Sequence, residues 1–305
     1  MGVNKESVIE NSCHMRATIG DARSKLEEAD IAVIGVPFEG TVTCRPGTRY
    51  GPRSIRQATW NLWTYNLYLG IDPFETLKIV DYGDLEVVHG NFEATALLIE
   101  KAVCEILSSG AVPFVLGGEH TISYPVIKTI GGKIGVVQFD AHMDLMDTSE
   151  GGEKLCHESA MRRVCEVAGS MNMVQIGIRT ASAEEHSYAR NEGIMYHTPL
   201  DVAKKGMNRI MSDFLRSMDQ LEGIYVTIDI DALDPSYAPG TGCHEPDGLS
   251  IREMITAIHS LDGAKLVGLD LVEVSPAGRF DPTPSVAAKL ILEAFAVIAR
   301  DKVKR

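Results

Sequence analysis

Short runs of apolar, often β-branched residues recur along this chain of 305 residues, and segments with a helical pattern separate them. The runs at 31–36, 134–139 and 224–229 have the length and composition of buried strands. The segment 94–110 has helical periodicity and ends in glycine, a frequent residue just after a helix. Strands that alternate with helices predict an α/β fold of three layers, α/β/α, with a mostly parallel central sheet.

Composition limits the classes of function. The formal net charge is −13, from 42 acidic and 29 basic residues, and this excess of acid argues against a nucleic-acid partner. No run approaches the roughly 20 apolar residues of a membrane span. The six cysteines form no CxxC pairs, which favours reduced thiols and a cytoplasmic location. No linker divides the chain, so we expect a single domain over 1–305, with 1–28 as an N-terminal extension packed on it.

Polar motifs directly follow four of the apolar runs. In parallel sheets, ligands bind beyond the carboxyl ends of the strands, so these positions are the candidates for chemistry. The motifs are GGEH at 117–120, DAHMD at 140–144, DIDALDP at 229–235 and EVSP at 273–276. We therefore expect a functional site at this edge of the sheet.

Side chains that bind divalent cations gather in three of these motifs. Acid and histidine alternate in DAHMD, so an extended backbone would point all three side chains to one face, and DID repeats the spacing. Each motif alone is common in polar loops and helix caps, but together they concentrate two imidazoles and four carboxylates, which call for positive charge. Two ions roughly 3.5–4 Å apart would use all six ligands. The candidates are His120, Asp140, His142, Asp144, Asp229 and Asp231.

The same ligand set bears on which metal is bound. Carboxylates and imidazoles without thiolates favour Mn over Zn, and the imidazoles make Mg less suitable. We therefore expect two Mn²⁺ ions per subunit, with Ni or Co as alternatives.

Together with RPGTRYGPRSIRQA at 45–58, HESAMRR at 157–163 and VQIGIR at 174–179, these motifs resemble the ureohydrolase family, which includes arginase and agmatinase. The resemblance runs over nearly the whole chain and is strongest to agmatinase. It implies an arginase-like fold and a homo-oligomer, either a trimer or a hexamer. It also implies that Asp140 and Asp229 bridge two metals, one completed by His120 and Asp144 and the other by His142 and Asp231.

The resemblance further implies three catalytic roles in the hydrolysis of a guanidinium group to urea and an amine. Glu273 would hold the guanidinium, because a carboxylate matches its paired N–H donors. Asp144 would orient the attacking hydroxide. His157 would bind near the substrate and pass a proton to the departing amine. The alternatives are an ion pair between Glu273 and Arg279, and a surface position for His157.

The loop after Asp144 bears on which guanidino compound binds. Arginases read the α-amino and α-carboxylate groups of arginine partly through an asparagine and a serine there, and this chain has Met146 and Glu153 at those offsets. The resemblance thus favours agmatine over arginine. Glu153 or Glu150 would pair with the distal ammonium of agmatine, or both would be solvated loop charges.

A departure from the family pattern lies at 243–249, where CHEPDGL replaces the TPEPGGL of agmatinase-like chains. Cys243 and His244 would narrow the pocket, or would shift specificity to guanidine, guanidinobutyrate or guanidinopropionate. His244 would otherwise form a hydrogen bond within its own loop.

Two other functional classes compete with this interpretation. A deacetylase with one zinc is disfavoured by the second histidine, His120, and by the paired acids of DAHMD. A catalytically silent paralogue is disfavoured because all six candidate ligands are present. Trp60, Trp63 and Tyr65 would belong to an interface or to the core, and the core is favoured.

Overall fold

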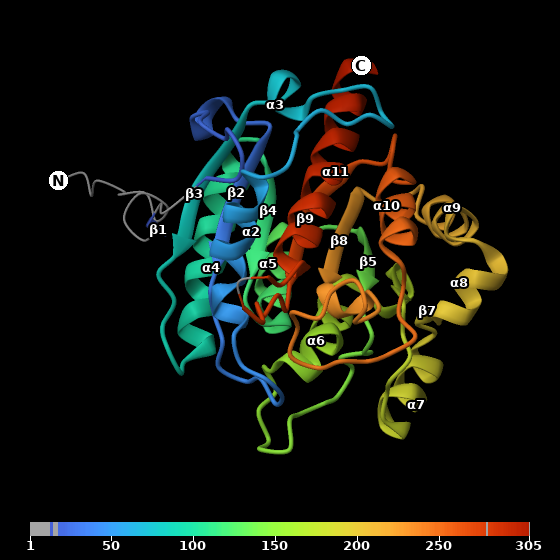
Figure 1. Ribbon diagram of the computed structural model, residues 1–305. Helices are drawn as coiled ribbons and strands as arrows, with labels where there is room; N and C mark the ends of the chain where they lie inside the picture. Colours follow the sequence, from blue (N-terminus) through green and yellow to red (C-terminus); the bar gives the residue numbers. More distant parts are fainter. Residues whose placement is uncertain (1–12, 15–17, 279, 305) are drawn as a thin grey trace.

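The computed structural model describes residues 13–14, 18–278 and 280–304, and its centre is one nine-stranded sheet (Figure 1). The strand order is β1-β3-β2-β4-β9-β8-β5-β6-β7. All neighbouring strands are parallel except β1 and β3 at one edge. The strands are β1 (Cys13–His14), β2 (Ile31–Val36), β3 (Ile79–Leu85), β4 (Val112–Gly117), β5 (Ile134–Phe139), β6 (Met173–Ile176), β7 (Met195–His197), β8 (Gly223–Asp229) and β9 (Leu266–Val272).

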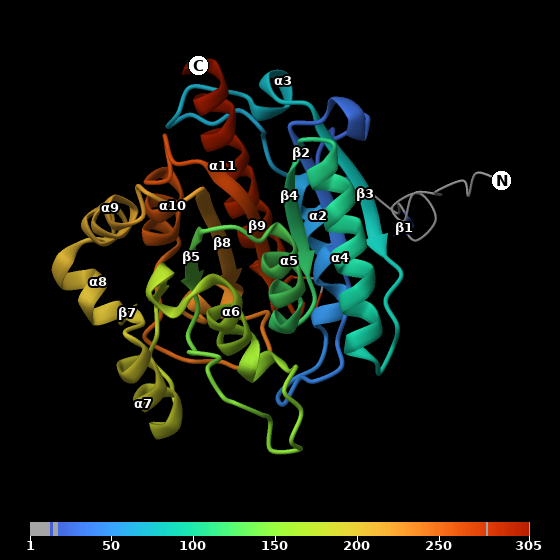
Figure 2. The same cartoon turned by 180° about the vertical axis from the view of Figure 1, so that it is seen from behind.

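Helices cover both faces of this sheet. Helices α2, α10 and α11 lie on the face seen in Figure 1, and α4, α5 and α6 lie on the opposite face, seen in Figure 2. The predicted three-layer architecture is thereby confirmed. The helices are α2 (Gly51–Thr59), α3 (Pro73–Thr76), α4 (Phe92–Ser108), α5 (Ser123–Ile130), α6 (Ala160–Ala168), α7 (Ala183–Glu192), α8 (Pro199–Lys205), α9 (Met207–Ser217), α10 (Ile251–His259) and α11 (Thr283–Lys304).

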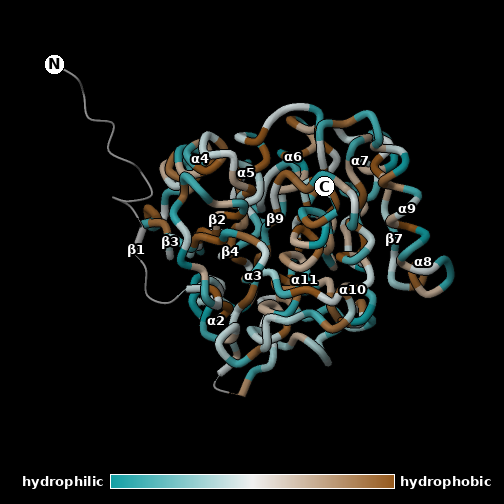
Figure 3. Tube along the Cα trace, turned by 90° about the horizontal axis from the view of Figure 1, so that it is seen from above, coloured by the Kyte–Doolittle hydropathy of each residue, from teal (hydrophilic) through white to brown (hydrophobic). Residues whose placement is uncertain are grey.

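The sheet separates two hydrophobic cores because successive strand residues point to opposite faces. In β2, Ile31 and Val33 join the core beneath α11, whereas Ala32 and Ile34 join the core beneath α4. Both sets are buried, so the sequence of this strand is apolar throughout and does not alternate between apolar and polar residues. Figure 3 shows hydrophobic segments along the strands between the helical layers.

Local signals in the sequence set the helix ends. Helix α10 begins after Ser250, whose hydroxyl accepts a hydrogen bond from Glu253 N, while the Glu253 carboxylate accepts one from Ser250 N. Helix α4 begins after Asn91, whose side chain accepts a hydrogen bond from Ala94 N, and ends at Ser108, two residues before Gly110, where φ is +86°. Both predicted helices are confirmed. None of the helices formed by the described residues has the length and apolar character to cross a membrane.

A buried ionic group ties α2 to β3. The Arg56 guanidinium, only 2% exposed, donates to both Asp81 oxygens at 2.8 and 2.9 Å and to Asp84 Oδ1 at 2.5 Å. Its Nη2 also donates to the Gly83 carbonyl at 2.8 Å. The cation is therefore fully paired, as a buried charge must be.

A second ionic group centres on Glu293 of α11. Its Oε2 accepts hydrogen bonds from Asn66 Nδ2 at 2.5 Å and His259 Nε2 at 2.6 Å, and Lys289 Nζ lies 2.5 Å from Oε1. Burial alone would raise the pKa of this carboxyl, but its three partners outweigh burial and lower the pKa to about 2. Glu293 thus joins the loop after α2 to both α10 and α11.

The prediction that Trp60, Trp63 and Tyr65 belong to the core is wrong. Their side chains are 57%, 94% and 52% exposed. They follow the end of α2 in a surface loop, where burial is set by neighbours that the local sequence does not specify. Of the expected N-terminal extension, residues 1–12 and 15–17 lie outside the described part of the chain, while Ile19 is buried and its N–H donates to Asp81.

Candidate metal centre and active site

The predicted functional residues meet at the carboxyl edge of four neighbouring strands, β4, β9, β8 and β5. His120 opens a short 3-10 turn after β4, and the DAHMD motif follows β5. Asp229 is the last residue of β8, and Asp231 lies in the 3-10 turn that follows. Glu273 comes directly after β9. Residues far apart in the sequence are therefore brought together by the parallel order of the strands.

Two groups of potential metal ligands share one aspartate. In the first, His120 Nδ1 lies 3.1 Å from Asp140 Oδ2, 3.0 Å from Asp144 Oδ2 and 3.5 Å from Asp229 Oδ2. In the second, His142 Nδ1 lies 3.0 Å from Asp231 Oδ2 and 3.5 Å from Asp140 Oδ1. The structure therefore brings all six predicted ligands together, with Asp140 between the two groups.

The hydrogen bonds around His120 leave its Nδ1 atom available to bind a cation. Nδ1 is buried without a hydrogen-bond partner and faces the carboxylates. The other ring nitrogen, Nε2, lies 2.9 Å from Thr227 Oγ1, and that hydroxyl donates its proton to Asp270 Oδ1 at 2.6 Å. The hydroxyl can therefore only accept from Nε2–H, which leaves the Nδ1 lone pair toward the acids. This tautomer, held by outer hydrogen bonds, is the usual arrangement of a metal-binding histidine.

Charge crowding supports the same conclusion. Burial and the neighbouring Asp140 raise the pKa of Asp144 to about 7, and burial with Asp231 and Asp140 raises the pKa of Asp229 well above its usual range. Burial lowers the pKa of His120, but the surrounding carboxylates outweigh burial and raise it. Protons and cations therefore compete for this site, and a metal ion would displace protons when it binds.

Two of the predicted catalytic acids have strained backbones. Asp144 has φ of +53° and Glu273 has φ of +62°, and Asp247 is the only other described non-glycine residue with positive φ. Such conformations cost about 1–3 kcal/mol and tend to occur at functional sites. Glu273 is held by its N–H, which donates to the Gly118 carbonyl at 2.8 Å, and by Oε1, which accepts from His120 N at 2.7 Å.

Arg279, the alternative partner of Glu273, lies outside the described residues. The ion pair between them therefore stays a prediction. Burial and the nearby Glu119 carboxylate raise the pKa of Glu273 well above its usual range. A cation placed against this carboxylate would stabilise its charged form and so offset the effect of burial and of Glu119.

His157 lies beside the metal centre and is held by two threonines. Its backbone N–H donates to Thr41 Oγ1 at 3.1 Å, and its ring Nε2 lies 3.2 Å from Thr43 Oγ1. The Thr41 hydroxyl in turn donates to Glu119 Oε1 at 2.6 Å, and this buried glutamate also accepts from the backbone N–H groups of Gly40 and Thr41. Burial lowers the pKa of His157.

Several contributors to the site were not singled out in the sequence. Glu119 stands next to a predicted ligand in GGEH, so its motif could have marked it. Thr41, Thr227 and Asp270 carry no local signal, because their roles depend on partners distant in the chain. Glu245 also belongs here, since its Oε1 lies 3.8 Å from His142 Nε2 and faces the outer side of that ring.

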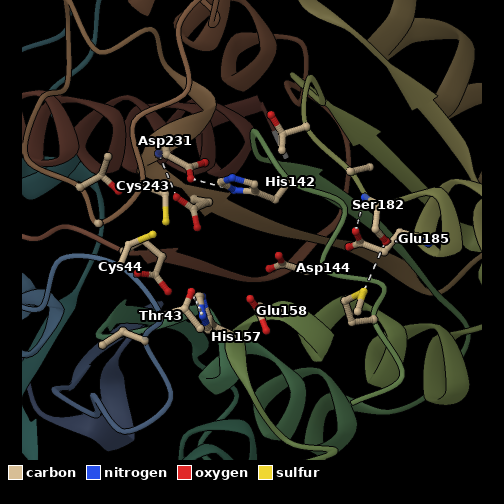
Figure 4. A pocket seen from close by; sticks show the side chains of 18 of the residues that line it. Thr43, Cys44, His142, Asp144, His157, Glu158, Ser182, Glu185, Asp231 and Cys243 are labelled. Atoms are coloured by element: carbon tan, nitrogen blue, oxygen red, sulfur yellow. Dashed lines mark hydrogen bonds and ion pairs between the residues drawn. The ribbon is translucent and has the colours of Figure 1, made fainter. Parts of the chain in front are cut away.

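A cavity of about 290 Å³ opens onto the metal centre (Figure 4). Asp144, His157 and Glu273 all line it, as do the metal-ligand candidates His142 and Asp231. His157 and Asp144 lie on one side of the cavity in Figure 4, and Asp231 and His142 lie across from them. The three residues with predicted catalytic roles therefore share one cavity.

The two predicted specificity residues do not line this cavity. Glu153 is exposed, its carboxylate accepts a hydrogen bond from the Ser149 hydroxyl, and it borders a neighbouring cavity instead. His244 is exposed, and its Nε2 lies 2.7 Å from the Pro239 carbonyl oxygen. This contact is the hydrogen bond within its own loop that was the alternative to a role in the pocket. Glu150 and Cys243, by contrast, line the cavity above the metal centre.

Comparison with known proteins agrees with this geometry. The model of the Arginase family matches residues 29–296. The chain is 37% identical to the agmatinase of Bacillus anthracis over 279 residues, which cover 88% of this chain and 91% of that one. It is also 37% identical to the mitochondrial guanidino acid hydrolase of Homo sapiens over 283 residues, or 90% of this chain and 80% of that one.

Solved structures confirm the predicted arginase-like fold. The agmatine ureohydrolase of Thermoplasma volcanium superposes with a TM-score of 0.87 at 33% sequence identity, and the match covers 95% of this chain and 96% of that one. The resemblance to ureohydrolases, most of all to agmatinase, is confirmed as well. By its sequence, its fold and the residues gathered at its sheet edge, the chain belongs to the arginase family.

Proposed function

We propose that this protein hydrolyses the guanidino group of agmatine to urea and putrescine. The observation that carries the proposal is the charge of the cavity. Seven carboxylates line it, three of which are metal-ligand candidates whose charge the metals would offset, and Arg45 is the only lysine or arginine among the described lining residues. The carboxylates are those of Asp144, Glu150, Glu158, Glu185, Asp229, Asp231 and Glu273.

Arg45 is partly occupied by the protein. Its Nη2 donates to the backbone carbonyls of Thr241 at 2.7 Å and Ser275 at 2.9 Å. These bonds hold two loops against each other, whereas Nε of the same guanidinium has no hydrogen-bond partner among the described residues. Outside the metal centre, three glutamates face this single cation in the described lining, so a substrate with a carboxylate tail, such as guanidinobutyrate, would meet an excess of negative charge, whereas the ammonium of agmatine would be attracted.

The glutamates outside the metal centre decide where that ammonium binds. Glu185 accepts hydrogen bonds from the backbone N–H groups of Leu145 and Ser182, so its charge is partly satisfied. Glu150 and Glu158 remain as partners for a cation in the same cavity. We assign the ammonium to Glu150, the alternative to Glu153, because Glu150 lines both this cavity and the neighbouring one, whereas Glu153 lines only the neighbouring one.

The six ligand candidates would hold two divalent cations, and their carboxylate-rich, thiolate-free donor set favours Mn²⁺. When bound, the cation pair supplies a nucleophile at neutral pH by lowering the pKa of a water molecule. The residues of the chain would do the rest. Glu273 would orient the guanidinium, and Asp144 would align the attacking group. His157 Nε2, held by Thr43, would pass a proton to the departing amine.

Urea release tests the proposal directly. The Mn-loaded protein, with Ni and Co preparations in parallel, would be assayed against agmatine, arginine, guanidine, guanidinobutyrate and guanidinopropionate. We expect kcat/KM for agmatine to exceed that for guanidinobutyrate by at least about 100-fold, because opposed like charges cost several kcal/mol. A preference for guanidinobutyrate would refute the charge argument, and no urea from any substrate would refute the function.

Matched variants separate the roles of the residues. Asp229→Asn should lose metal and activity together, whereas Glu273→Gln should keep both metals and lose turnover. Glu150→Gln should raise KM for agmatine, and Glu153→Gln is its control outside the cavity. An equal effect of the last two substitutions would contradict the assignment of the ammonium to Glu150.

We further propose that the protein assembles as a homo-oligomer, a trimer or a hexamer. The exposed side chains of Trp60, Trp63 and Tyr65 support this proposal, because large aromatic groups are common at interfaces. Light scattering coupled to size-exclusion chromatography would measure the mass, and a monomer would refute it. The cytoplasmic location stays a prediction.

A further inference from the structure

Two cysteines face each other at the mouth of the cavity. Cys44 lies in the loop after β2, and Cys243 lies in the loop after β8, far away in the sequence. Figure 4 shows their sulfur atoms turned toward one another beside Asp231 and Thr43. Both residues are free cysteines and line the same cavity.

The backbones that carry these thiols are also in contact. Arg45, next to Cys44, donates through Nη2 to the Thr241 carbonyl at 2.7 Å. A Cβ atom at Gly242 would stand only 3.2 Å from the Arg45 carbonyl oxygen. The two loops are therefore in contact at residues adjacent to both cysteines, as a disulfide between them requires.

The two thiols differ in exposure. Cys44 is exposed, whereas Cys243 is only partly exposed, so a solvent-borne oxidant meets Cys44 first. Cys104 on α4 is exposed too, while Cys156 and Cys165 are buried. Cys104 thus serves as a matched control of similar accessibility.

We propose that Cys44 and Cys243 form a site of reversible oxidation, where a low-mass disulfide of the glutathione class converts the thiol pair into a disulfide across the cavity mouth. The Cys44 thiolate attacks a sulfur of that disulfide and expels one thiolate. The Cys243 thiolate then attacks Cys44 Sγ and expels the second. The pair loses two electrons and two protons, and the oxidant is reduced to two thiols.

The bond would also disturb the catalytic side of the cavity. Formation of an S–S bond of about 2.05 Å draws the two sulfurs well inside their contact distance. Cys44 directly follows Thr43, whose hydroxyl lies 3.2 Å from His157 Nε2. The shift would weaken this contact and displace the histidine. This second step rests on the proposed function, and we expect kcat to fall by about tenfold, a fraction of what general acid–base catalysis supplies.

Peptide mapping without reduction tests the pairing independently of activity. Trypsin would release the two cysteines in separate peptides, 26–49 and 217–252, each with a single thiol. After incubation with oxidised glutathione, we expect these peptides to be joined, with a mass two hydrogens below their sum. Cys44→Ser and Cys243→Ser should abolish the joined species, and Cys104→Ser should retain it.

Each other result would overturn one part of the proposal. A stable glutathione adduct on Cys44 without the joined peptide, or a joined peptide that involves Cys104, would overturn the pairing. Unchanged urea release by the fully joined protein, or a loss that dithiothreitol does not restore, would overturn the effect on turnover. If no guanidine is hydrolysed even by the reduced protein, the proposed function fails while the mapping still decides the pairing.

Discussion

Replacing Thr227 with valine would isolate the hydrogen bond behind the metal centre. The Thr227 hydroxyl accepts from His120 Nε2 at 2.9 Å and donates to Asp270 Oδ1 at 2.6 Å. All three residues are at most 1% exposed, so water cannot take the place of the lost hydroxyl. Valine has nearly the shape of threonine and leaves no cavity, so the substitution removes the hydrogen bonds while preserving the packing.

The expected magnitude follows from those contacts. A buried donor left without an acceptor costs about 1–3 kcal/mol. In metal sites, loss of an outer hydrogen bond that orients a ligand weakens metal binding about 10- to 100-fold. We therefore expect Thr227→Val to raise the Kd for Mn²⁺ by about 10- to 100-fold, which is about 1.4–2.8 kcal/mol. Asp270 keeps its bond from the Tyr225 hydroxyl at 2.6 Å, which limits the damage beyond the histidine.

Isothermal titration of the metal-free protein with Mn²⁺ would measure this change without using turnover. Thr227→Ser retains a hydroxyl and should bind metal nearly as the parent does. Thr256→Val on α10 removes a hydroxyl that bonds only to the Arg252 carbonyl, and it should leave the Kd unchanged. A Thr227→Val protein that binds Mn²⁺ within twofold of the parent would refute the inference that Thr227 fixes the tautomer of His120.

Three further predictions concern other described contacts. Thr41→Val removes the hydroxyl that accepts a hydrogen bond from His157 N, and it should lower kcat about tenfold with little change in KM. Thr41→Ser keeps the hydroxyl and should retain turnover. Equal losses of kcat in steady-state assays of both variants would contradict this role. Glu293→Gln should cost about 1–3 kcal/mol at neutral pH in urea unfolding. Because the folded pKa of Glu293 lies below its unfolded value of 4.5, its contribution is present above that value and is lost as pH falls toward 2, so the difference between parent and variant should shrink over this range. Arg56→Ala leaves Asp81 buried without its cation and should destabilise the fold by about 3–5 kcal/mol, and a thermal midpoint equal to that of the parent would count against the pairing.

The interior pattern of the strands and helices could be predicted from local sequence. The run at 31–36 is apolar throughout because β2 is buried on both faces, and the capping box after Ser250 fixes the start of α10 by bonds between near neighbours. The DAHMD motif predicted three polar groups at the end of β5, and they lie there, although Asp144, with φ of +53°, departs from the extended backbone that the alternation assumed. Each of these features is decided within a few residues of chain.

The prediction for the aromatic residues after α2 was wrong because their burial depends on residues distant in the sequence. Trp63 is 94% exposed, although it carries one of the largest aromatic side chains in the sequence. The exposure of a loop side chain depends on which other segments pack over the loop, and the sequence of the loop has no periodic pattern that would predict this packing. Glu153 has the charge expected for a substrate partner, yet the path of its loop places it beside a neighbouring cavity.

Local sequence was enough to predict the layered fold, the edge of the sheet that holds the candidate site and the six candidate ligands, because strand periodicity and short motifs encode them locally. Three other features became visible in the folded chain: which nitrogen of His120 faces the acids, the support of His157 by Glu119 and Thr41, and the proximity of the Cys44 and Cys243 thiols. These contacts join loops distant in the chain. Their geometry depends on the order and register of the parallel strands, which bring the loops to one edge.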